Sequence, residues 1–366
     1  MSQSNALRCA VLAGDGVGPE ITAATVEILQ AAARRVSLPL DLEELPIGFK
    51  SYNKWKTTLS DATIRKLRGH TGWILGPTFA GEYPKDDPLK GHPSGYLRKN
   101  FALFANVRPV KAWPQLNPLI SDLDVTVIRE NTQGFYPDRN MAWGYGEFLP
   151  TADVALSVRV ITTSACERFA RFSLEYATAL GHDSLAILHK RTALPQTEAL
   201  FVDAFERLKG EFPKVKTELV RIDTFSSSLP RDYKKYRLVA TTNLFGDIAS
   251  DQASGLAGGV AVAPSLNAGT DQAMAQAVHG TAADIEGKNI ANPTALALST
   301  AMLLRWFDQK KRDQRCRDTA DLIERGIHGA MQAGALTHDL GGRASTTDFT
   351  RAVISAIEAS PAPRGS

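Results

Sequence analysis

Short apolar segments bounded by turn residues recur along this chain and alternate with longer stretches of helical pattern. Continuous apolar runs are typical of strands buried on both faces, as in parallel sheets. Helices between such strands provide the crossover connections that parallel pairing needs. The sequence therefore predicts an α/β protein with a mainly parallel, buried sheet. The expected strands are 8–13, 71–76, 125–128, 185–188 and 237–241, and the expected helices include 20–35, 166–179 and 198–209.

Residues 137–160 break this alternation. Gly, Trp and Tyr residues come first, and apolar side chains then alternate at Val154, Leu156, Val158 and Val160. Alternation with a period of two is typical of extended structure. We expect a β arm that projects from the α/β body and serves dimerisation.

Charge and cysteine usage exclude several classes of function. The 366 residues carry a net charge of +3, spread along the chain, so no basic patch predicts nucleic-acid binding. The three cysteines have no CxxC spacing and predict free thiols in a reducing compartment. The N-terminus lacks a signal-peptide pattern and no apolar run reaches membrane-spanning length, so we expect a cytoplasmic protein. Residues 360–366 are expected to be a disordered tail.

A glycine-rich turn, Gly14-Asp15-Gly16-Val17-Gly18, follows the first strand and precedes the first helix. That position suits a dinucleotide fingerprint, but the spacing is GxGxG and not GxGxxG. No acidic residue ends a second strand at the expected distance. The pattern favours a tight strand-to-helix turn near a ligand.

Asp247 and Asp251 are four residues apart, so on a helix both carboxylates project from one face. Like charges there repel unless a cation lies between them, and hard oxygen ligands suit Mg²⁺ or Mn²⁺. A solvated acidic face is the alternative, but the neighbouring residues are mostly apolar or small. The pair therefore predicts a metal site.

Three arginines, Arg98, Arg108 and Arg129, lie at or near the ends of apolar stretches. The planar guanidinium group matches the two oxygens of a carboxylate. Each alone is equally well explained as a structural ion-pair partner. Together with an acidic metal site, they suggest a substrate that is held by several carboxylates. A Gly- and Asn-containing loop at 278–294, which leads into a helix, suits an anion or a nucleotide, although composition leaves that open.

The combined motifs resemble the isocitrate/isopropylmalate dehydrogenase family, the NAD(P)-dependent β-decarboxylating dehydrogenases. They occur in family order over nearly the whole chain, from Gly14-Asp15-Gly16-Val17-Gly18-Pro19-Glu20 to the helix after Asn292. The resemblance implies an isocitrate/isopropylmalate dehydrogenase-like fold, with two α/β domains around a central cleft, and not a true Rossmann fold. Residues 1–103 and 258–366 would form the large, cofactor-binding domain. Residues 104–257 would form the small domain for substrate, metal and dimerisation.

The resemblance also implies roles for individual residues. Catalytic roles would fall on Tyr136, Lys190 and Asp223, and metal binding on Asp223, Asp247 and Asp251. Lys190 and Asp223 would reach the partner's site in a homodimer. The remaining implied residues are Arg98, Arg108, Arg129 and Tyr96 for substrate, and His279, Gly280, Thr281, Ala282, Asp284, Ile285 and Asn292 for the cofactor.

The expected cofactors are NAD and Mg²⁺ or Mn²⁺. Asp284 favours NAD, because a carboxylate accepts hydrogen bonds from ribose hydroxyls and repels a 2′-phosphate; NADP-preferring relatives tend to carry Lys-Tyr where this chain has Asp284-Ile285. The implied reaction is oxidation of a small malate-type 2-hydroxy acid, followed by loss of CO₂. A regulatory subunit without catalysis is the alternative from another class, but the Tyr, Lys and Asp residues that it would lose are present.

The substrate itself is not determined by the sequence. Isopropylmalate enzymes usually place Leu residues before the first substrate arginine, where this chain has Gly91-His92-Pro93-Ser94-Gly95-Tyr96. Isocitrate enzymes usually have Ser-x-Asn there, and the Asn is missing. Gln133, Thr192 and Gln276 are further departures from common family residues. We expect a tartrate-like or alkylmalate-like substrate, with isopropylmalate, D-malate, isocitrate and homoisocitrate as alternatives.

Overall fold

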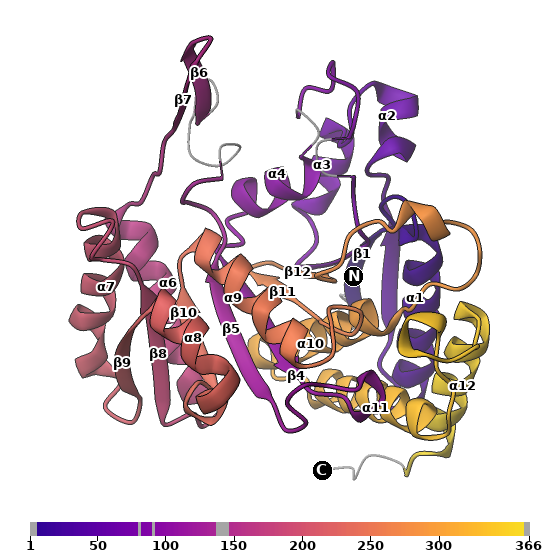
Figure 1. Cartoon of the computed structure of the whole chain (residues 1–366). Coiled ribbons are helices and arrows are strands. Elements are labelled where there is room, and N and C mark those ends of the chain that lie inside the picture. Colours follow the sequence, from indigo (N-terminus) through magenta and orange to yellow (C-terminus); the bar gives the residue numbers. More distant parts are fainter. Residues whose placement is uncertain (1–5, 80–81, 90–91, 137–145, 362–366) are drawn as a thin grey trace. The chain divides into compact units, whose positions relative to one another are not determined.

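The computed structural model describes residues 6–79, 82–89, 92–136 and 146–361 (Figure 1). Internal contacts divide the chain into two compact units. The first comprises Met1–Ser94, Val260–Leu266 and Asp271–Ser366, and the second comprises Gly95–Gly259 with Asn267–Thr270. Residues 95–103, which the sequence analysis places in the large domain, make their contacts within the second unit. The cleft between two domains stays a prediction.

The first unit is built on parallel strands in the order β2-β1-β3-β12. Its strands are β1 (Leu7–Leu12), β2 (Leu40–Glu44), β3 (Gly72–Leu75) and β12 (Ala273–Gln276). Its helices are α1 (Gly18–Arg35), α2 (Phe49–Trp55), α3 (Asp61–Leu67), α10 (Thr294–Lys311), α11 (Gln314–Gln332) and α12 (Thr346–Ala359). Strand β11 (Leu266–Ala268) lies where the chain passes from one unit to the other.

The turn after β1 is shaped by close backbone packing. Gly14 and Gly16 have positive φ angles of 76° and 58°. A Cβ atom on Gly14 would lie 2.1 Å from the carbonyl oxygen of Pro77, and one on Gly16 would lie 2.3 Å from that of Thr281. The buried Asp15 carboxylate accepts hydrogen bonds from the Phe49 amide at 2.8 Å and from the Tyr83 hydroxyl. The glycine-rich motif is therefore a packing turn, as its spacing predicts.

The second unit contains strands in the order β4-β5-β10-β8-β9. Only the β4–β5 pair is antiparallel among these, so the strands of this unit pair mainly in parallel, as predicted. Its core is apolar and includes Val127, Leu188, Phe225 and Val239. The strands are β4 (Ala105–Lys111), β5 (Asp124–Glu130), β8 (Ser184–His189), β9 (Lys216–Arg221) and β10 (Leu238–Thr241). The helices are α4 (Pro93–Asn100), α6 (Thr163–Ala179), α7 (Thr197–Leu208), α8 (Ile222–Asp232) and α9 (Asn243–Leu256).

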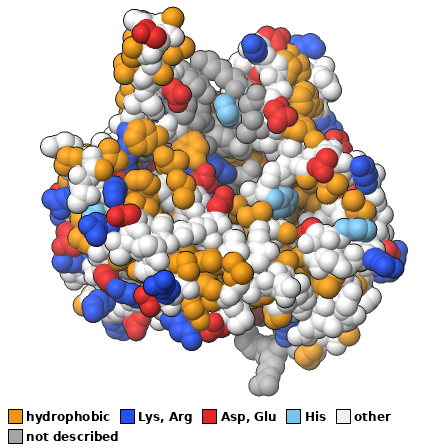
Figure 2. Space-filling model, viewed as in Figure 1, with side chains coloured by type: hydrophobic (Ala, Val, Ile, Leu, Met, Phe, Trp, Pro, Cys, Tyr) orange, Lys and Arg blue, Asp and Glu red, His pale blue; other side chains and the backbone are white. Residues whose placement is uncertain are grey.

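A hairpin of β6 (Glu147–Thr151) and β7 (Val154–Ser157) stands away from α6 and α7 in the second unit (Figure 1). Every residue of both strands is exposed. Phe148, Leu149, Val154 and Leu156 give it apolar surface, which is visible at the upper left of Figure 2. The hairpin lies within the segment predicted to form a β arm. Residues 137–145 of that segment lie outside the described residues.

Two other observations bear on the sequence expectations. Among the described residues, no helix is both long enough and apolar enough to cross a bilayer. The predicted tail falls mostly on residues 362–366, which lie outside the described part of the chain.

Candidate active site

Strands β4 and β5 present three polar side chains on one face of the second unit. Asn106 pairs with Arg129, and Arg108 pairs with Val127. Residues two apart on a strand point to the same side, so Asn106, Arg108 and Arg129 share that face. All three are buried, with Arg108 only 5% and Arg129 only 2% exposed. Buried guanidinium groups need anionic or polar partners, and helix α9 carries them.

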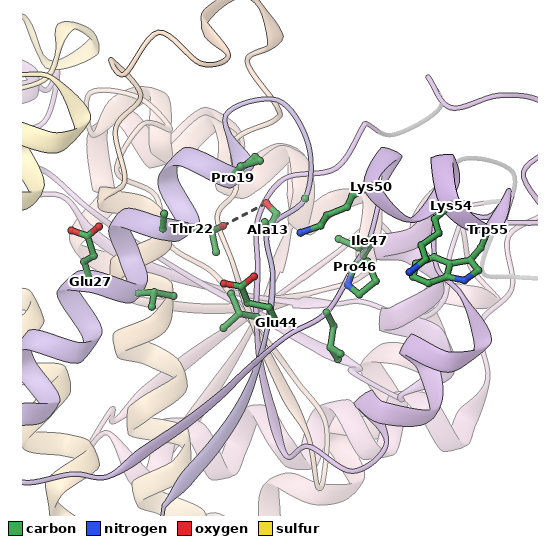
Figure 3. Close-up of a pocket in the computed structure, with 15 residues that line it drawn as sticks. Ala13, Pro19, Thr22, Glu27, Glu44, Pro46, Ile47, Lys50, Lys54 and Trp55 are labelled. Carbon is green, nitrogen blue, oxygen red and sulfur yellow. Dashed lines mark hydrogen bonds between the residues drawn. The ribbon is translucent and has the colours of Figure 1, made fainter.

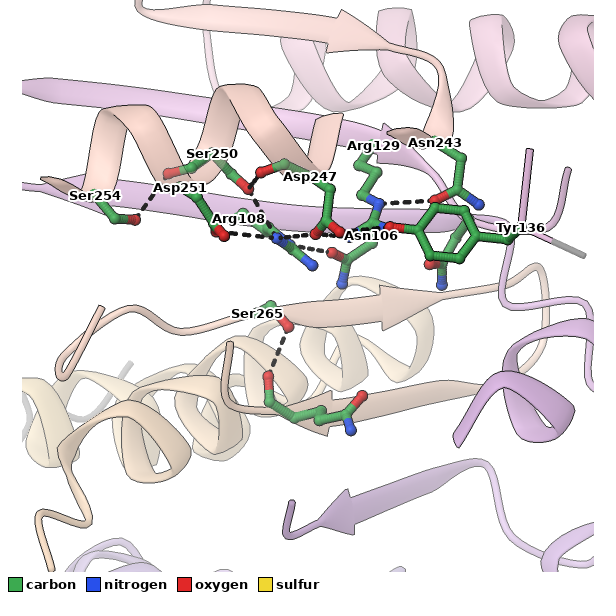
Figure 4. A network of polar contacts seen from close by, with 12 residues as sticks. Asn106, Arg108, Arg129, Tyr136, Asn243, Asp247, Ser250, Asp251, Ser254 and Ser265 are labelled. Carbon is green, nitrogen blue, oxygen red and sulfur yellow. Dashed lines mark hydrogen bonds and ion pairs between the residues drawn. The ribbon is translucent and has the colours of Figure 1, made fainter. Parts of the chain in front are cut away.

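The Asp247 carboxylate on α9 accepts hydrogen bonds from both guanidinium groups (Figure 4). Arg108 Nη1 donates to Asp247 Oδ1 at 3.1 Å and to Ser250 Oγ at 2.8 Å. Arg129 Nη1 donates to the same Asp247 oxygen, and its Nε donates to Asn243 Oδ1 at 2.9 Å. Two of the three sequence-predicted arginines and the first predicted metal carboxylate are therefore brought together within one unit.

Three asparagines that the sequence analysis missed hold this face in place. Arg108 Nε donates to Asn106 Oδ1 at 2.5 Å. The amides of Asn106 and Asn131 both donate to Asn267 Oδ1, at 3.0 and 2.9 Å. All three side chains are fully buried. The available signal was an asparagine inside an apolar strand, because buried amides are kept where they are hydrogen-bonded.

A glycine allows α9 to approach β5 closely. A Cβ atom on Gly246 would lie 2.6 Å from Cγ, 2.7 Å from Cβ and 3.2 Å from Cα of Arg129. The first two distances are far below van der Waals contact, which begins at 3.4 Å. Glycine at this position therefore sets the distance between the helix that bears Asp247 and the strand that bears Arg129.

Tyr136 completes the cluster from the turn after β5. Its hydroxyl donates to Asp247 Oδ2 at 2.5 Å. The Arg129 guanidinium carbon lies 5.2 Å from the centre of its ring, within the range of a cation–π contact. The predicted catalytic tyrosine therefore touches both the predicted substrate arginine and the predicted metal carboxylate.

The charges of this cluster shift its ionisation. Burial raises the pKa of Asp247, but the Arg129 and Arg108 charges outweigh it and leave the pKa below its ordinary value. Burial, and then the charge of Arg129, lower the pKa of Arg108 to about 10. Burial raises the pKa of Asp251, and the charge of Asp247 adds to this effect against the opposing charge of Arg108.

These carboxylates fit a hard divalent cation. Asp251 Oδ1 lies 3.8 Å from Arg108 Nη1, and its side chain is 59% exposed, so its oxygens are accessible. A cation beside Asp251 would offset the cost of burying its charge and the repulsion from Asp247, the two effects that raise its pKa. Among the described residues of this chain, no group of three or more His, Cys, Asp or Glu side chains forms a complete metal site. The donor set fits Mg²⁺ or Mn²⁺ with a further ligand from outside the Asp247–Asp251 pair.

The predicted catalytic lysine lies with the third predicted metal carboxylate. Lys190 follows β8, and its Nζ is 2.8 Å from Oδ1 of Asp223, in the first turn of α8. The hydrogen bond from Lys190 lowers the pKa of Asp223. Both side chains are partly exposed, at 30% and 52%. Lys190 and Asp223 thus form a second cluster of predicted site residues.

The remaining predicted substrate residues lie on α4. Arg98 is partly buried, and its charge contributes to the lowered pKa of Asp247. Tyr96 is also partly buried, and its carbonyl accepts from the Asn100 side chain at 3.0 Å. Arg98 therefore acts on the Asp247 cluster, whereas the described contact of Tyr96 is made by its backbone.

The predicted cofactor loop lies in the first unit. Ala282 adopts a left-handed backbone with φ 41°, and a short 3₁₀ turn, η4 (Ala283–Ile285), exposes the Asp284 side chain. Burial lowers the pKa of His279, which favours its neutral form. Gly280, Thr281 and Ile285 lie in the same loop.

Contacts that the sequence analysis did not foresee anchor this loop. Glu20 on α1 accepts from the Asn289 and Ala291 amides at 3.2 and 3.0 Å, and from the Thr346 hydroxyl. Asn292 accepts from the Thr294 amide at 3.0 Å and donates to Asp339 at 3.0 Å. The Asn292 side chain therefore fixes the junction between the loop and α10.

A cavity of about 710 Å³ also opens in the first unit, beside α1, β2 and α2 (Figure 3). Its walls include Thr22, Val26 and Ile47, and Glu44 and Lys50 are among its charged residues. None of the predicted substrate, metal or cofactor residues lines it. The cavity is therefore no part of the predicted site.

Comparisons with known proteins agree with this arrangement of motifs. Residues 8–353 match the family model described as isocitrate/isopropylmalate dehydrogenase. The isocitrate/homoisocitrate dehydrogenase of Thermus thermophilus is 34% identical over 96% of this chain and 99% of its own length. The 3-isopropylmalate dehydrogenase of Methanothermobacter thermautotrophicus is 34% identical, with coverage of 96% and 99%.

A solved structure extends the likeness to the fold. The crystal structure of isocitrate dehydrogenase from Methylococcus capsulatus matches 96% of this chain and 99% of its own, with a TM-score of 0.84 and 29% identity. The α/β fold predicted from the sequence is thereby confirmed. The chain belongs to the isocitrate/isopropylmalate dehydrogenase family of NAD(P)-dependent decarboxylating dehydrogenases.

Proposed function

We propose that this enzyme is a metal-dependent, NAD-linked dehydrogenase that oxidises a malate-type 2-hydroxy acid and decarboxylates it to a 2-keto acid and CO₂. The observation that carries this proposal is the convergence of Arg108, Arg129 and Tyr136 on Asp247. Two buried guanidinium groups beside a carboxylate suited to a divalent cation match a substrate with several carboxylates and a hydroxyl.

The chain's own residues divide the work of the reaction. Bound Mg²⁺ or Mn²⁺ would make the 2-hydroxyl more acidic, and bound NAD would accept the hydride from C2. Arg98, Arg108 and Arg129 hold the carboxylates in register. Lys190 lies beside Asp223 and, as the neutral amine, takes up the hydroxyl proton to become an ammonium ion. The β-carboxylate then leaves as CO₂, and Tyr136 donates a proton to the enolate at C3.

NAD is the proposed cofactor, bound at His279, Gly280, Thr281, Ala282, Asp284, Ile285 and Asn292. The exposed Asp284 carboxylate supports this choice, because it can accept hydrogen bonds from ribose hydroxyls and would repel a 2′-phosphate. Replacing Asp284 by Lys together with Ile285 by Tyr should raise the kcat/KM ratio of NADP to NAD. An unchanged ratio in a folded double variant would contradict the cofactor assignment.

The proposed assembly is a homodimer in which Lys190 and Asp223 serve the partner's site. The exposed apolar side chains of the β6–β7 hairpin support an interface there. Leu244 and Ile248 add apolar surface on α9, 36% and 55% exposed and four residues apart on the helix. The pairing of Asp223 with Lys190 is consistent with a proposed role in which both residues serve the partner's site together.

For the substrate we propose a 3-substituted or unsubstituted malate of the isopropylmalate, tartrate or D-malate type. Isocitrate and homoisocitrate are the alternatives, and the names of the relatives divide between the two groups. His92, Ser94 and Tyr96 on or beside α4 precede Arg98, so they are the residues expected to meet the substituent at C3.

A spectrophotometric screen for NADH production tests the proposal. The purified protein is supplied with Mn²⁺ or Mg²⁺, NAD and each of D-malate, tartrate, isopropylmalate, isocitrate, homoisocitrate and the methylmalates. Asp247→Asn should abolish both turnover and Mn²⁺ binding measured by calorimetry, whereas Asp271→Asn, at an exposed carboxylate of the first unit, should change neither. Full turnover in a folded Asp247→Asn variant would refute the metal assignment.

A further inference from the structure

A fully buried carboxylate lies directly behind Lys190. Glu198, in the first turn of α7, is 0% exposed. Its Oε2 accepts the backbone N–H of Lys190 at 2.8 Å, and its Oε1 accepts from Nη2 of Arg159. The two oxygens of one carboxylate therefore have different donors. The proposed reaction has no direct use for Glu198.

Arg159 connects this carboxylate to the other site elements of the same unit. Its side chain is 6% exposed, and it donates to the hydroxyl groups of Thr197 at 2.6 Å and Thr242 at 3.3 Å. Thr242 is the N-cap residue of α9. The guanidinium carbon lies 5.4 Å from the ring centre of Phe135, the residue before Tyr136. The buried pair thus contacts three segments that carry proposed catalytic groups.

A buried ion pair of this kind is a weak source of stability, because taking both charges out of water offsets most of their attraction. The pair instead fixes the geometry around it, because each buried charged group keeps all its hydrogen bonds only when its partners stay in one arrangement. At Lys190 the geometry concerns the backbone, since the Lys190 carbonyl also accepts the amides of Ala193 and Leu194, both at 3.0 Å. Both backbone polar groups of Lys190 are therefore held by hydrogen bonds, and Glu198 holds the N–H group.

We propose that Glu198, oriented by Arg159, is a positioning residue that fixes the backbone at Lys190 and so aims the Lys190 side-chain nitrogen at the reacting hydroxyl. This inference rests on the proposed role of Lys190. Glu198 acts through the lysine and does not touch the substrate arginines, so its loss should change turnover and leave substrate binding intact. A purely structural ion pair would instead affect stability, with no selective effect on kcat.

Glu198→Gln tests this with the shape of the side chain conserved. The amide nitrogen cannot accept a hydrogen bond, so either Lys190 N–H or Arg159 loses its acceptor. We expect kcat to fall by roughly 10²-fold, the cost of a misplaced catalytic group, with the substrate KM little changed. The Arg159→Lys variant, with Glu198 intact, keeps a cation beside this carboxylate and should retain most of the wild-type kcat. Glu211→Gln, the same change at the exposed ion pair with Arg171, is the matched control and should leave kcat unaltered.

Hybrid dimers, made by co-expressing two differently tagged chains, assign Glu198 to one half of the site. If Glu198 serves Lys190, a hybrid of Glu198→Gln with Tyr136→Phe contains one intact site and regains activity. A hybrid of Glu198→Gln with Lys190→Ala then stays inactive, because both changes damage the part of the site that contains Lys190 and neither of the two sites is intact. Activity in the hybrid with Lys190→Ala and none in the hybrid with Tyr136→Phe would overturn the proposal. An unaltered kcat in the folded Glu198→Gln homodimer would also overturn it.

A hybrid of Tyr136→Phe with Lys190→Ala separates this inference from the proposed function. Recovered activity supports a site shared between subunits. If this hybrid is inactive, the shared site is wrong, and the Glu198 inference is decided by the kcat loss at unchanged KM in the Glu198→Gln homodimer.

Discussion

Gly246→Ala tests whether the spacing between α9 and β5 controls the site. The added Cβ would lie 2.6 Å from Arg129 Cγ and 2.7 Å from its Cβ, and these atoms belong to a buried residue of β5. Ordinary contact begins at 3.4 Å, so α9 must move by about 0.8 Å, the difference from 2.6 Å. Overpacking of this kind costs about 1–3 kcal/mol, while alanine gains about 1 kcal/mol over glycine within a helix.

The same helix offers a matched control. Gly255 is exposed, and an added Cβ there meets no atom within 4 Å. Gly255→Ala should therefore gain up to about 1 kcal/mol in the free energy of unfolding and keep full activity. The difference in unfolding free energy between the two variants, measured with urea, isolates the clash and should be about 1–3 kcal/mol.

Activity gives the sharper readout, because Asp247 follows Gly246 and moves with it. A displacement approaching 1 Å at a catalytic carboxylate lowers turnover by roughly 10²-fold. NADH production by Gly246→Ala should fall by that factor, whereas Gly255→Ala should match the wild type. Equal activity of the two folded variants would refute the argument that glycine sets the position of Asp247.

Three further predictions concern the thiols, the cofactor loop and acid stability. Burial raises the pKa of all three cysteine thiols to about 12, so a thiol reagent at about pH 8 should label none in the native protein and all three in guanidinium: Cys9, Cys166 and Cys316. Glu20→Gln removes an acceptor that anchors the cofactor loop, and the KM for NAD should rise several-fold with the substrate KM unchanged; equal KM values would contradict this. The pKa of Asp247 is depressed in the fold, so its stabilising contribution is present above the unfolded pKa of about 4 and is lost as the pH falls through the folded value. Urea midpoints should therefore decline on acidification below about pH 4 more steeply in the wild type than in Asp247→Asn, and parallel curves would contradict the pKa assignment.

The strands that the sequence predicts are those with uninterrupted apolar runs. Segments such as Val125–Ile128 and Leu185–Leu188 are buried on both faces, and no other local structure explains them as well. Strands β2 and β9 escaped prediction because both contain charged residues and are partly exposed. Strand β4 escaped because Asn106, Arg108 and Pro109 interrupt its apolar pattern. Those interruptions are part of the candidate site.

The candidate site was predictable where its chemistry is local. The spacing of Asp247 and Asp251 follows from one helix, and the arginines stand out at the ends of apolar segments. The contact of Arg129 with Asp247 depends on the β4–β5 register and on the packing that Gly246 allows, which are properties of the fold. Glu198 and Arg159 lie 39 residues apart, and neither carries a local pattern that predicts a buried pair.

The proposed reaction couples an oxidation to the loss of CO₂, and the ratio of NADH to CO₂ measures that coupling. With Mn²⁺, NAD and the best substrate of the screen, NADH is measured by absorbance and CO₂ by trapping of label from the β-carboxylate. Equal amounts of NADH and CO₂ are expected, and the Tyr136→Phe and Lys190→Ala variants should form both products more slowly than the wild type. Sustained NADH formation without CO₂, or no turnover of any malate-type acid by folded, metal-loaded protein, would contradict the proposed reaction.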